Sequence, residues 1–240
     1  MSEIAEKIEI FRENFPVIEE KIAAAAKRSG RSREDITLLA ATKTVPVEVI
    51  NYAFQNGLKF MGENRVQEYF EKIEQLECGI SQRHFIGHLQ TNKVAKLIGT
   101  VSMIQSVDSI RLAKEISKRS IEAGVVTDIL LEVNIGEEES KTGASPDAML
   151  ALAEECAALS GISVKGLMAI PPITPDKDLL RQIFSNIYHL FIDIRDKKID
   201  NIEMGILSMG MSDDFETAIE EGATLVRIGS SLFGKRNYNI

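Results

Sequence analysis

A single lysine follows a short apolar run, at a position where its amine could do covalent chemistry. The run LLAAT ends at Thr42, and Lys43 comes directly after it. Partial burial at the end of a strand disfavours a charged ammonium relative to the neutral amine, and a neutral amine can attack an aldehyde to form an imine. Position alone favours a simpler arrangement, in which the apolar stem of Lys43 lies on the protein and its ammonium reaches water.

A segment near the end of the chain has the pattern of a phosphate site. Residues 227–234, RIGSSLFG, read as a strand, a tight turn and the start of a helix. Gly229 lets a ligand approach the backbone closely. The N–H groups of Gly229, Ser230 and Ser231 would then be free donors at a helix N-terminus, where anions bind.

The preceding loop, MGMSDDFETAIEEG at 209–222, has a matching pattern. Gly210 is expected to make a turn and Ser212 to cap a helix, whose first turn Asp213 and Asp214 complement. Capping alone would account for such serines. Because barrels often hold phosphate in the loops after strands seven and eight, two such loops in succession make phosphate binding about as well supported as simple helix capping.

Arg227 lies one residue inside the last predicted strand, where a charged side chain needs a partner. It could pair with a carboxylate inside the fold. It could instead donate to the ring nitrogen of a ligand and keep that nitrogen unprotonated, because a guanidinium does not release its proton.

Asparagines and a charged segment give weaker signals. Asn64 and Asn134 follow predicted strands and could orient a ligand, although asparagine is common in turns. Arg65, Glu68 and Lys72 are interpreted as the solvated face of a helix.

The histidines and cysteines do not suggest a metal site. His84, His88 and His189 have no cysteine or paired acid at metal-ligand spacing, and His84 is expected to be packed and hydrogen-bonded. Cys78 and Cys156 show no metal or redox spacing, which favours a reducing compartment.

These residues must be positioned by an alternation of strands and helices. The expected strands are residues 36–42, 58–62, 83–87, 102–106, 128–134, 163–170, 206–209 and 224–228, with helices beginning near residues 46, 65, 91, 109, 146, 178 and 212. An extra amphipathic helix over residues 2–29 precedes them, with Pro16 as a candidate kink.

Runs such as ITLLAAT and ILLEVN are almost continuously apolar, as strands of parallel sheets are when both faces are covered. Eight such strands favour one closed (β/α)8 barrel over residues 1–240, with an open doubly wound sheet as the alternative. In a parallel barrel the site lies at the C-terminal ends of the strands, where these polar residues gather.

The composition is that of an ordinary globular protein, with 44% hydrophobic and 27% charged residues. A net charge of −8 argues against nucleic-acid and anionic-membrane surfaces. The N-terminal residues do not form a signal peptide, and no apolar run is long enough to span a bilayer. We therefore expect a cytoplasmic protein, and a monomer because no exposed apolar helix face stands out.

Seven segments in order resemble the pyridoxal phosphate homeostasis protein family. They are LLAATKT around Lys43, MGENRVQE (61–68), HFIGHLQTNK (84–93), SVDS (106–109), EVNIGEEESKTG (132–143), GLMAIPP (166–172) and LSMGMSDDFETAIEEGATLVRIGSSLFGKRNY (207–238). The resemblance covers nearly the whole chain.

The resemblance implies a barrel like the N-terminal domain of alanine racemase, with pyridoxal 5′-phosphate held on Lys43 as an internal aldimine. It also implies roles for six other residues: Arg227 facing the pyridine nitrogen, Ser212, Gly229 and Ser230 holding the phosphate, and Asn64 and Met211 lining the ring. The family is associated with vitamin B6 and amino-acid balance, with no firmly established reaction, and pyridoxal-phosphate-dependent apo-enzymes are candidate recipients.

A cofactor carrier is favoured over a catalyst. A racemase needs an acid or base on each face of the substrate carbon, and Lys43 could serve one face. None of the four tyrosines falls at a predicted strand end, no second domain is expected after the barrel, and an arginine at the ring nitrogen weakens the ring as an electron sink.

Three alternatives stay open. They are a slow pyridoxal-phosphate-dependent racemase, an aldolase-type barrel in which Lys43 captures a sugar-phosphate aldehyde without a cofactor, and a non-catalytic scaffold. Whether Lys141, Lys93 or another lysine holds a second cofactor molecule is also open.

Overall fold

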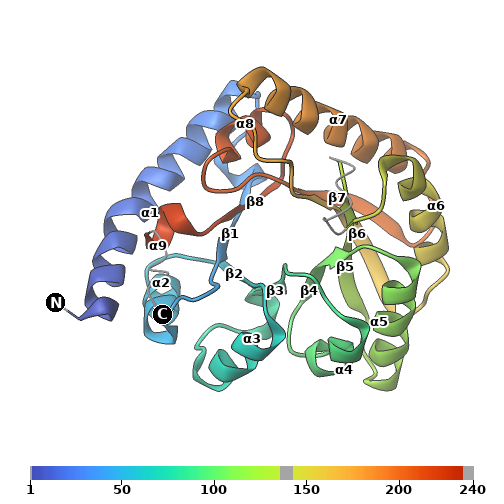
Figure 1. Cartoon of the computed structure of the whole chain (residues 1–240), viewed down its shortest axis with the longest axis horizontal. Helices are drawn as coiled ribbons and strands as arrows, with labels where there is room; N and C mark the ends of the chain where they lie inside the picture. Colours follow the sequence, from blue (N-terminus) through green and yellow to red (C-terminus); the bar gives the residue numbers. More distant parts are fainter. Residues whose placement is uncertain (1, 136–142, 235–240) are drawn as a thin grey trace.

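Eight parallel strands close into one barrel with helices around it (Figure 1). The computed structural model describes residues 2–135 and 143–234. The strands are β1 (Thr37–Ala41), β2 (Phe60–Glu63), β3 (Arg83–Phe85), β4 (Met103–Val107), β5 (Thr127–Val133), β6 (Ile162–Ala169), β7 (Ile202–Ser208) and β8 (Leu225–Ile228). β1 pairs with both β2 and β8, so the predicted (β/α)8 barrel is confirmed and the open sheet is wrong.

The helices follow the strands in the expected order. They are α1 (Glu3–Arg28), α2 (Val47–Gln55), α3 (Val66–Lys72), α4 (Val94–Leu97), α5 (Ile110–Glu122), α6 (Pro146–Ala157), α7 (Lys177–Asp196), α8 (Phe215–Glu220) and α9 (Ser230–Phe233). Short 3₁₀ turns occupy Arg33–Asp35, Ile73–Gln75, Ile80–Gln82 and Thr91–Lys93.

The predicted boundaries are wrong mainly where polar residues interrupt an apolar pattern. β7 begins at Ile202 rather than residue 206, because the exposed Glu203 and Gly205 hide the start of the strand. The helix expected near residue 91 begins as a 3₁₀ turn, and the one expected at Ser212 begins at Phe215.

α1 is the extra N-terminal helix that the sequence predicts. The Ser2 side chain caps it by accepting from the N–H of Ala5, and the acidic Glu3 and Glu6 lie in its first turn, where they complement the helix dipole. Pro16 is exposed within it and does not divide it. The helix packs along α8 and α9, where it covers the join between the first and last strands (Figure 1).

Alternate residues of each strand face opposite sides of the barrel wall. In β1, Leu38 and Ala40 join the main core between the strands and the helices, whereas Leu39 belongs to a separate cluster with Ile86 and Leu225. A third cluster contains Met103, Leu130 and Met168. The last two clusters are the apolar filling of the barrel interior, as expected for a packed core rather than a pore.

A chain of buried polar side chains crosses this interior from β8 to β3. The Arg227 guanidinium donates to Ser208 Oγ (2.6 Å), and this hydroxyl donates to Gln105 Oε1 (2.7 Å). Gln105 Nε2 lies 2.8 Å from His84 Nδ1. Because arginine only donates and the amide nitrogen only donates, the direction of every bond is fixed, and His84 Nδ1 must be the acceptor.

His84 is therefore neutral, with its proton on Nε2. Burial lowers the pKa of His84 to about 4. The expected packed and hydrogen-bonded histidine is confirmed, since its side chain is buried and bound to Gln105.

The neutral His84 makes stability depend on pH. An unfolded histidine takes up its proton near pH 6.5, and the folded one only near pH 4, so the unfolded state binds more protons between these values. We expect the free energy of unfolding to fall by up to about 3 kcal/mol as the pH drops through this window. Urea unfolding at a series of pH values measures this free energy.

The matched variants are His84→Gln and His189→Gln, because His189 is exposed. His84→Gln should flatten the dependence of the free energy of unfolding on pH, and His189→Gln should leave that dependence unchanged. Equal slopes in both variants would contradict a buried neutral His84.

Candidate cofactor site

Lys43 lies in the turn that follows β1. Leu39 and Ala41, the last inward-facing residues of β1, lie just before this turn. Its side chain is half-buried. Within residues 2–135 and 143–234 the ammonium has no hydrogen bond or ion pair, so a half-buried amine is available at the end of β1.

A network of buried charges holds this turn from the outer side of the wall. Thr42 Oγ1 donates to Glu63 Oε1 (2.7 Å). Lys72 Nζ donates to the carbonyl of Thr42 (3.0 Å), to Glu63 (3.0 Å) and to Glu68 (2.7 Å). Glu68 also accepts from the N–H of Thr44, which has a φ of +64°. The left-handed backbone at Thr44 is thus fixed by α3.

The solvated-face interpretation is therefore wrong for Glu68 and Lys72 and holds for Arg65, which is exposed. The side chains of Glu68 and Lys72 are only 17% and 13% exposed. Their i, i+4 spacing suggested an ordinary surface pair, and no local pattern indicated that β1 and β2 would bring Thr42 and Glu63 beneath them. Burial raises the pKa of Glu63, and Lys72 opposes that rise.

Arg227 points inward from β8 and is bound to uncharged oxygens. Its other donors reach the carbonyls of Ser208 (2.9 Å) and Ala169 (2.9 Å). Desolvation lowers the pKa of Arg227 to about 10, while Asp214 and Glu132 act to raise it, so the guanidinium stays charged at neutral pH. No carboxylate of the described chain forms an ion pair with it, which speaks against the purely structural pairing.

The two serine loops meet, but not as the sequence predicts. Ser212 does not cap α8, whose N-cap residue is Asp214. Its Oγ accepts instead from the N–H groups of Gly229 (3.2 Å) and Ser231 (3.3 Å). The expectation that both N–H groups are free is therefore wrong in this structure. The sequence could not show that the loops after β7 and β8 touch each other.

Glycine is required at position 210, and little room is left for a Cβ at Gly229. Gly210 has a φ of +91°, and a Cβ there would lie 2.5 Å from the Cβ of Ala218. A Cβ on Gly229 would lie 3.2 Å from the carbonyl oxygen of Ala41, so the β8 loop passes close to the end of β1. Ser230 is exposed at the start of α9.

Asn64 and Met211 complete the predicted set, and both are half-buried. Asn64 follows β2, where its backbone packs on Gly87 so closely that a Cβ on Gly87 would lie 2.0 Å from the Asn64 carbonyl oxygen. Met211 follows β7, and its N–H donates to Asp214. The predicted residues thus follow or end β2, β1, β8 and β7, four neighbouring strands of the closed barrel.

Other features bear on what the site can bind. Among the residues that the structure describes, no group of three His, Cys, Asp or Glu side chains could hold a metal ion. No described helix is both long and apolar enough to cross a membrane. Lys141, a candidate for a second cofactor site, lies outside the described residues, whereas Lys93 is exposed.

Comparisons with known proteins identify the family. The family model for the N-terminal domain of alanine racemase matches residues 11–237. The pyridoxal phosphate homeostasis protein of Aquifex aeolicus is 47% identical, over 91% of this chain and 95% of that one. The Escherichia coli K12 protein of the same name is 37% identical, over 94% and 97%.

Solved structures lead to the same family. PipY of Synechococcus elongatus, solved with pyridoxal phosphate bound, superposes with a TM-score of 0.78 at 30% identity, over 90% of this chain and 100% of that one. Alanine racemase of Clostridium difficile shares the fold, with a TM-score of 0.74 at 18% identity, over 96% of this chain and 58% of that one. The chain belongs to the pyridoxal phosphate homeostasis protein family, and its barrel is an alanine racemase N-terminal domain.

Proposed function

We propose that this chain binds pyridoxal 5′-phosphate covalently through Lys43 and carries the cofactor rather than turning over a substrate. The observation that supports this most is the half-buried amine of Lys43, which has no partner in the described chain and lies in the turn directly after β1. The structure of PipY with pyridoxal phosphate bound and the names of the similar curated proteins agree with this proposal.

The chemical groups at the four strand ends fit the parts of this cofactor. The aldehyde suits the amine of Lys43, and the pyridine nitrogen suits Arg227, which can donate to it but not protonate it. The phosphate suits Ser212, Gly229 and Ser230, where backbone N–H groups gather at a turn. Asn64 and Met211 would line the ring. When bound, the cofactor supplies an electrophilic aldehyde.

The phosphate of the cofactor would accept from N–H groups that donate to Ser212 Oγ in this structure. The N–H groups of Gly229 and Ser231 are held at 3.2 and 3.3 Å from Ser212 Oγ, which is long for hydrogen bonds to a hydroxyl. A phosphate oxygen is a stronger acceptor because it is charged. The hydroxyl of Ser212 would then turn to donate to the same anion.

The carrier role is supported by the positions of the tyrosines. Tyr69 donates to the carbonyl of Thr100, before β4, and Tyr52 packs against Phe11 of α1. Tyr188 packs against Gly222, before β8. None of these described tyrosines lies at the C-terminal ends of the strands, so no tyrosine there opposes Lys43 as a racemase would need. Tyr238 lies outside the described residues.

Several sequence-based expectations stay predictions. They are the cytoplasmic location, the monomeric state, the single domain over residues 1–240, the supply of apo-enzymes and the link to vitamin B6.

The covalent attachment is tested by spectroscopy on the purified protein. With pyridoxal phosphate we expect a yellow absorption band, which borohydride reduction converts into a stable adduct on the peptide containing Lys43. Lys43→Ala should abolish the band and the adduct, whereas Lys59→Ala, an exposed lysine, should keep both. A colourless wild-type protein after addition of the cofactor would refute the proposal and favour the aldolase-type barrel or the scaffold.

The buried network beneath the turn is tested through Lys72. Lys72→Met leaves Glu63 buried without its cation, which we expect to lower the free energy of unfolding by about 3 kcal/mol. It also releases the Thr44 turn, so the Kd for pyridoxal phosphate should rise about tenfold or more, beyond any loss from unfolding.

Absorbance titration and urea unfolding measure the two effects of Lys72→Met. Lys59→Met is the matched control. An unchanged Kd in a destabilised Lys72→Met protein would show that the network serves stability alone.

A further inference from the structure

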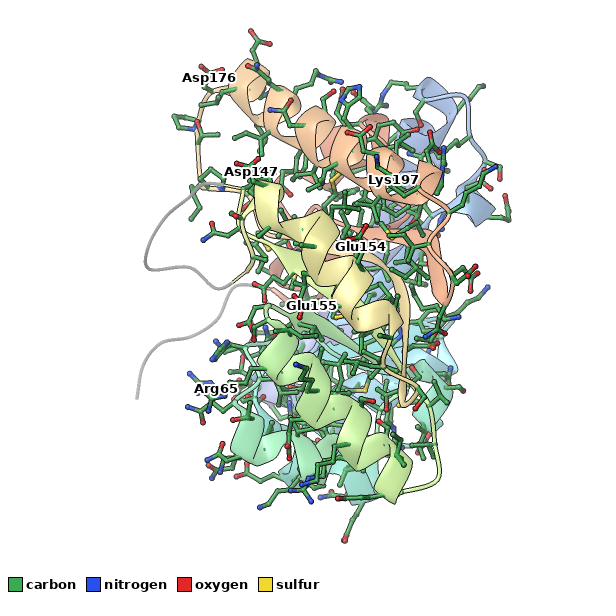
Figure 2. All side chains as sticks on the ribbon, turned by 90° about the vertical axis from the view of Figure 1, so that its right-hand side faces the viewer. Arg65, Asp147, Glu154, Glu155, Asp176 and Lys197 are labelled. Atoms are coloured by element: carbon green, nitrogen blue, oxygen red, sulfur yellow. The ribbon has the colours of Figure 1, made fainter. Side chains whose placement is uncertain are left out.

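A groove between α3 and α4 adjoins the site described above and shares Asn64 with it. It has a volume of about 610 Å³, and the side chains that line it include Arg65, Gln67, Phe70, Gln90, Lys93 and Lys96. We call it the α3–α4 groove. Figure 2 shows Arg65 at the same end of the molecule as Asp147 and Asp176, which lie at the starts of α6 and α7, the helices that follow β5 and β6 in the chain. The groove therefore opens at the end of the barrel that carries Lys43.

The lining of the groove carries more positive than negative charge. Its permanent cations are Arg65, Lys93 and Lys96, and the side chains of all three lack an ion pair or hydrogen bond within the described residues. Its one carboxylate is Glu71, to which Gln67 donates at 3.3 Å. Three cations against one carboxylate give the groove a net positive charge, which favours the binding of an anion.

Several exposed arginines elsewhere are paired with acids. Arg28, Arg119 and Arg181 each bind two glutamates. His88, at the edge of the groove, is different from the three cations because its Nδ1 lies 3.7 Å from Asp108. The three groove cations thus differ from these paired arginines in forming no ion pair within the described residues.

The neutral side chains suit a flat, phosphorylated molecule. Gln67 and Gln90 can donate to phosphate oxygens through their amides. Phe70 is 37% exposed, which leaves a ring on which an aromatic ligand can stack. A guanidinium binds a phosphate in a bidentate manner.

α3 joins this groove to the Lys43 turn. Gln67, Phe70 and Glu71 line the groove, whereas Glu68 and Lys72 of the same helix hold the turn at Thr42 and Thr44. Asn64, just before α3, lines the groove and is also expected to line the cofactor ring. A ligand in the groove is therefore separated from Lys43 by one helix and the Asn64 loop.

We propose that the α3–α4 groove is a non-covalent capture site for phosphomonoester anions, which concentrates the phosphorylated aldehyde beside Lys43 before it is bound. This proposal rests on the proposed function. The groove raises the rate of association by electrostatic attraction, and it contributes nothing to the bound state.

Stopped-flow absorbance of the apo-protein with pyridoxal phosphate tests the capture step. At low ionic strength Lys93→Glu/Lys96→Glu should lower the association rate constant about tenfold or more. At about 1 M salt, where the Debye length is about 3 Å, the difference should vanish. The dissociation rate and the final spectrum should not change.

The matched control is Lys114→Glu/Lys118→Glu. These exposed lysines of α5 undergo the same change of charge on another helix. Lys93→Gln/Lys96→Gln provides a milder change and should give an intermediate rate. Equal slowing in the groove variant and the control, or slowing that persists at high salt, would overturn the proposal.

A second measurement separates this proposal from the attachment at Lys43. Pyridoxine 5′-phosphate has no aldehyde and cannot react with an amine. In ¹⁵N-labelled Lys43→Ala protein we expect it, and inorganic phosphate more weakly, to shift the amide signals of Lys93 and Lys96. Absence of these shifts would overturn the groove proposal even if Lys43 binds the cofactor. If these shifts occur but the wild-type protein never forms the yellow band, the groove proposal is supported and the proposed function is refuted.

Discussion

The buried positive charge of Arg227 determines how the polar side chains inside the barrel are hydrogen-bonded. A guanidinium that is 4% exposed must have its donors satisfied, and here oxygens of β6 and β7 accept from it. Ser208, which accepts from Arg227, donates to Gln105, and Gln105 in turn donates to His84 Nδ1. This hydrogen bond requires His84 to be neutral. One charge thus fixes the orientation of side chains on opposite walls, and the apolar clusters fill the remaining space.

The same charge bears on what the site can do. A pyridine nitrogen that faces a guanidinium accepts a hydrogen bond without gaining a proton. The ring then withdraws electrons less strongly, which disfavours carbanion chemistry on a bound amino acid. Covalent holding of the aldehyde needs only the amine of Lys43. The order of the barrel interior and the proposed carrier role thus both depend on the placement of Arg227.

Much of this could be predicted from the sequence because the signals are local. Near-continuous apolar runs predicted buried parallel strands, and the polar residues at the ends of those runs included Lys43 and Arg227. The fold was predicted from the number and order of the runs. The histidine at position 84 was also interpreted correctly as a packed residue.

The failures concern contacts between segments that are distant in the chain. Ser212 looked like a helix cap, because nothing local shows that its hydroxyl meets the N–H groups of Gly229 and Ser231. Lys72 looked like a surface residue, because its partners Thr42 and Glu63 come from two other elements.

The most direct test of this account is the protonation state of the bound ring nitrogen. It is measured by ¹⁵N NMR of the protein loaded with ¹⁵N-labelled pyridoxal phosphate. The account predicts the signal of an unprotonated pyridine nitrogen over the whole pH range in which the protein is folded. A pyridinium signal at neutral pH would contradict it, because the ring would then be an effective electron sink and Arg227 would not be its partner.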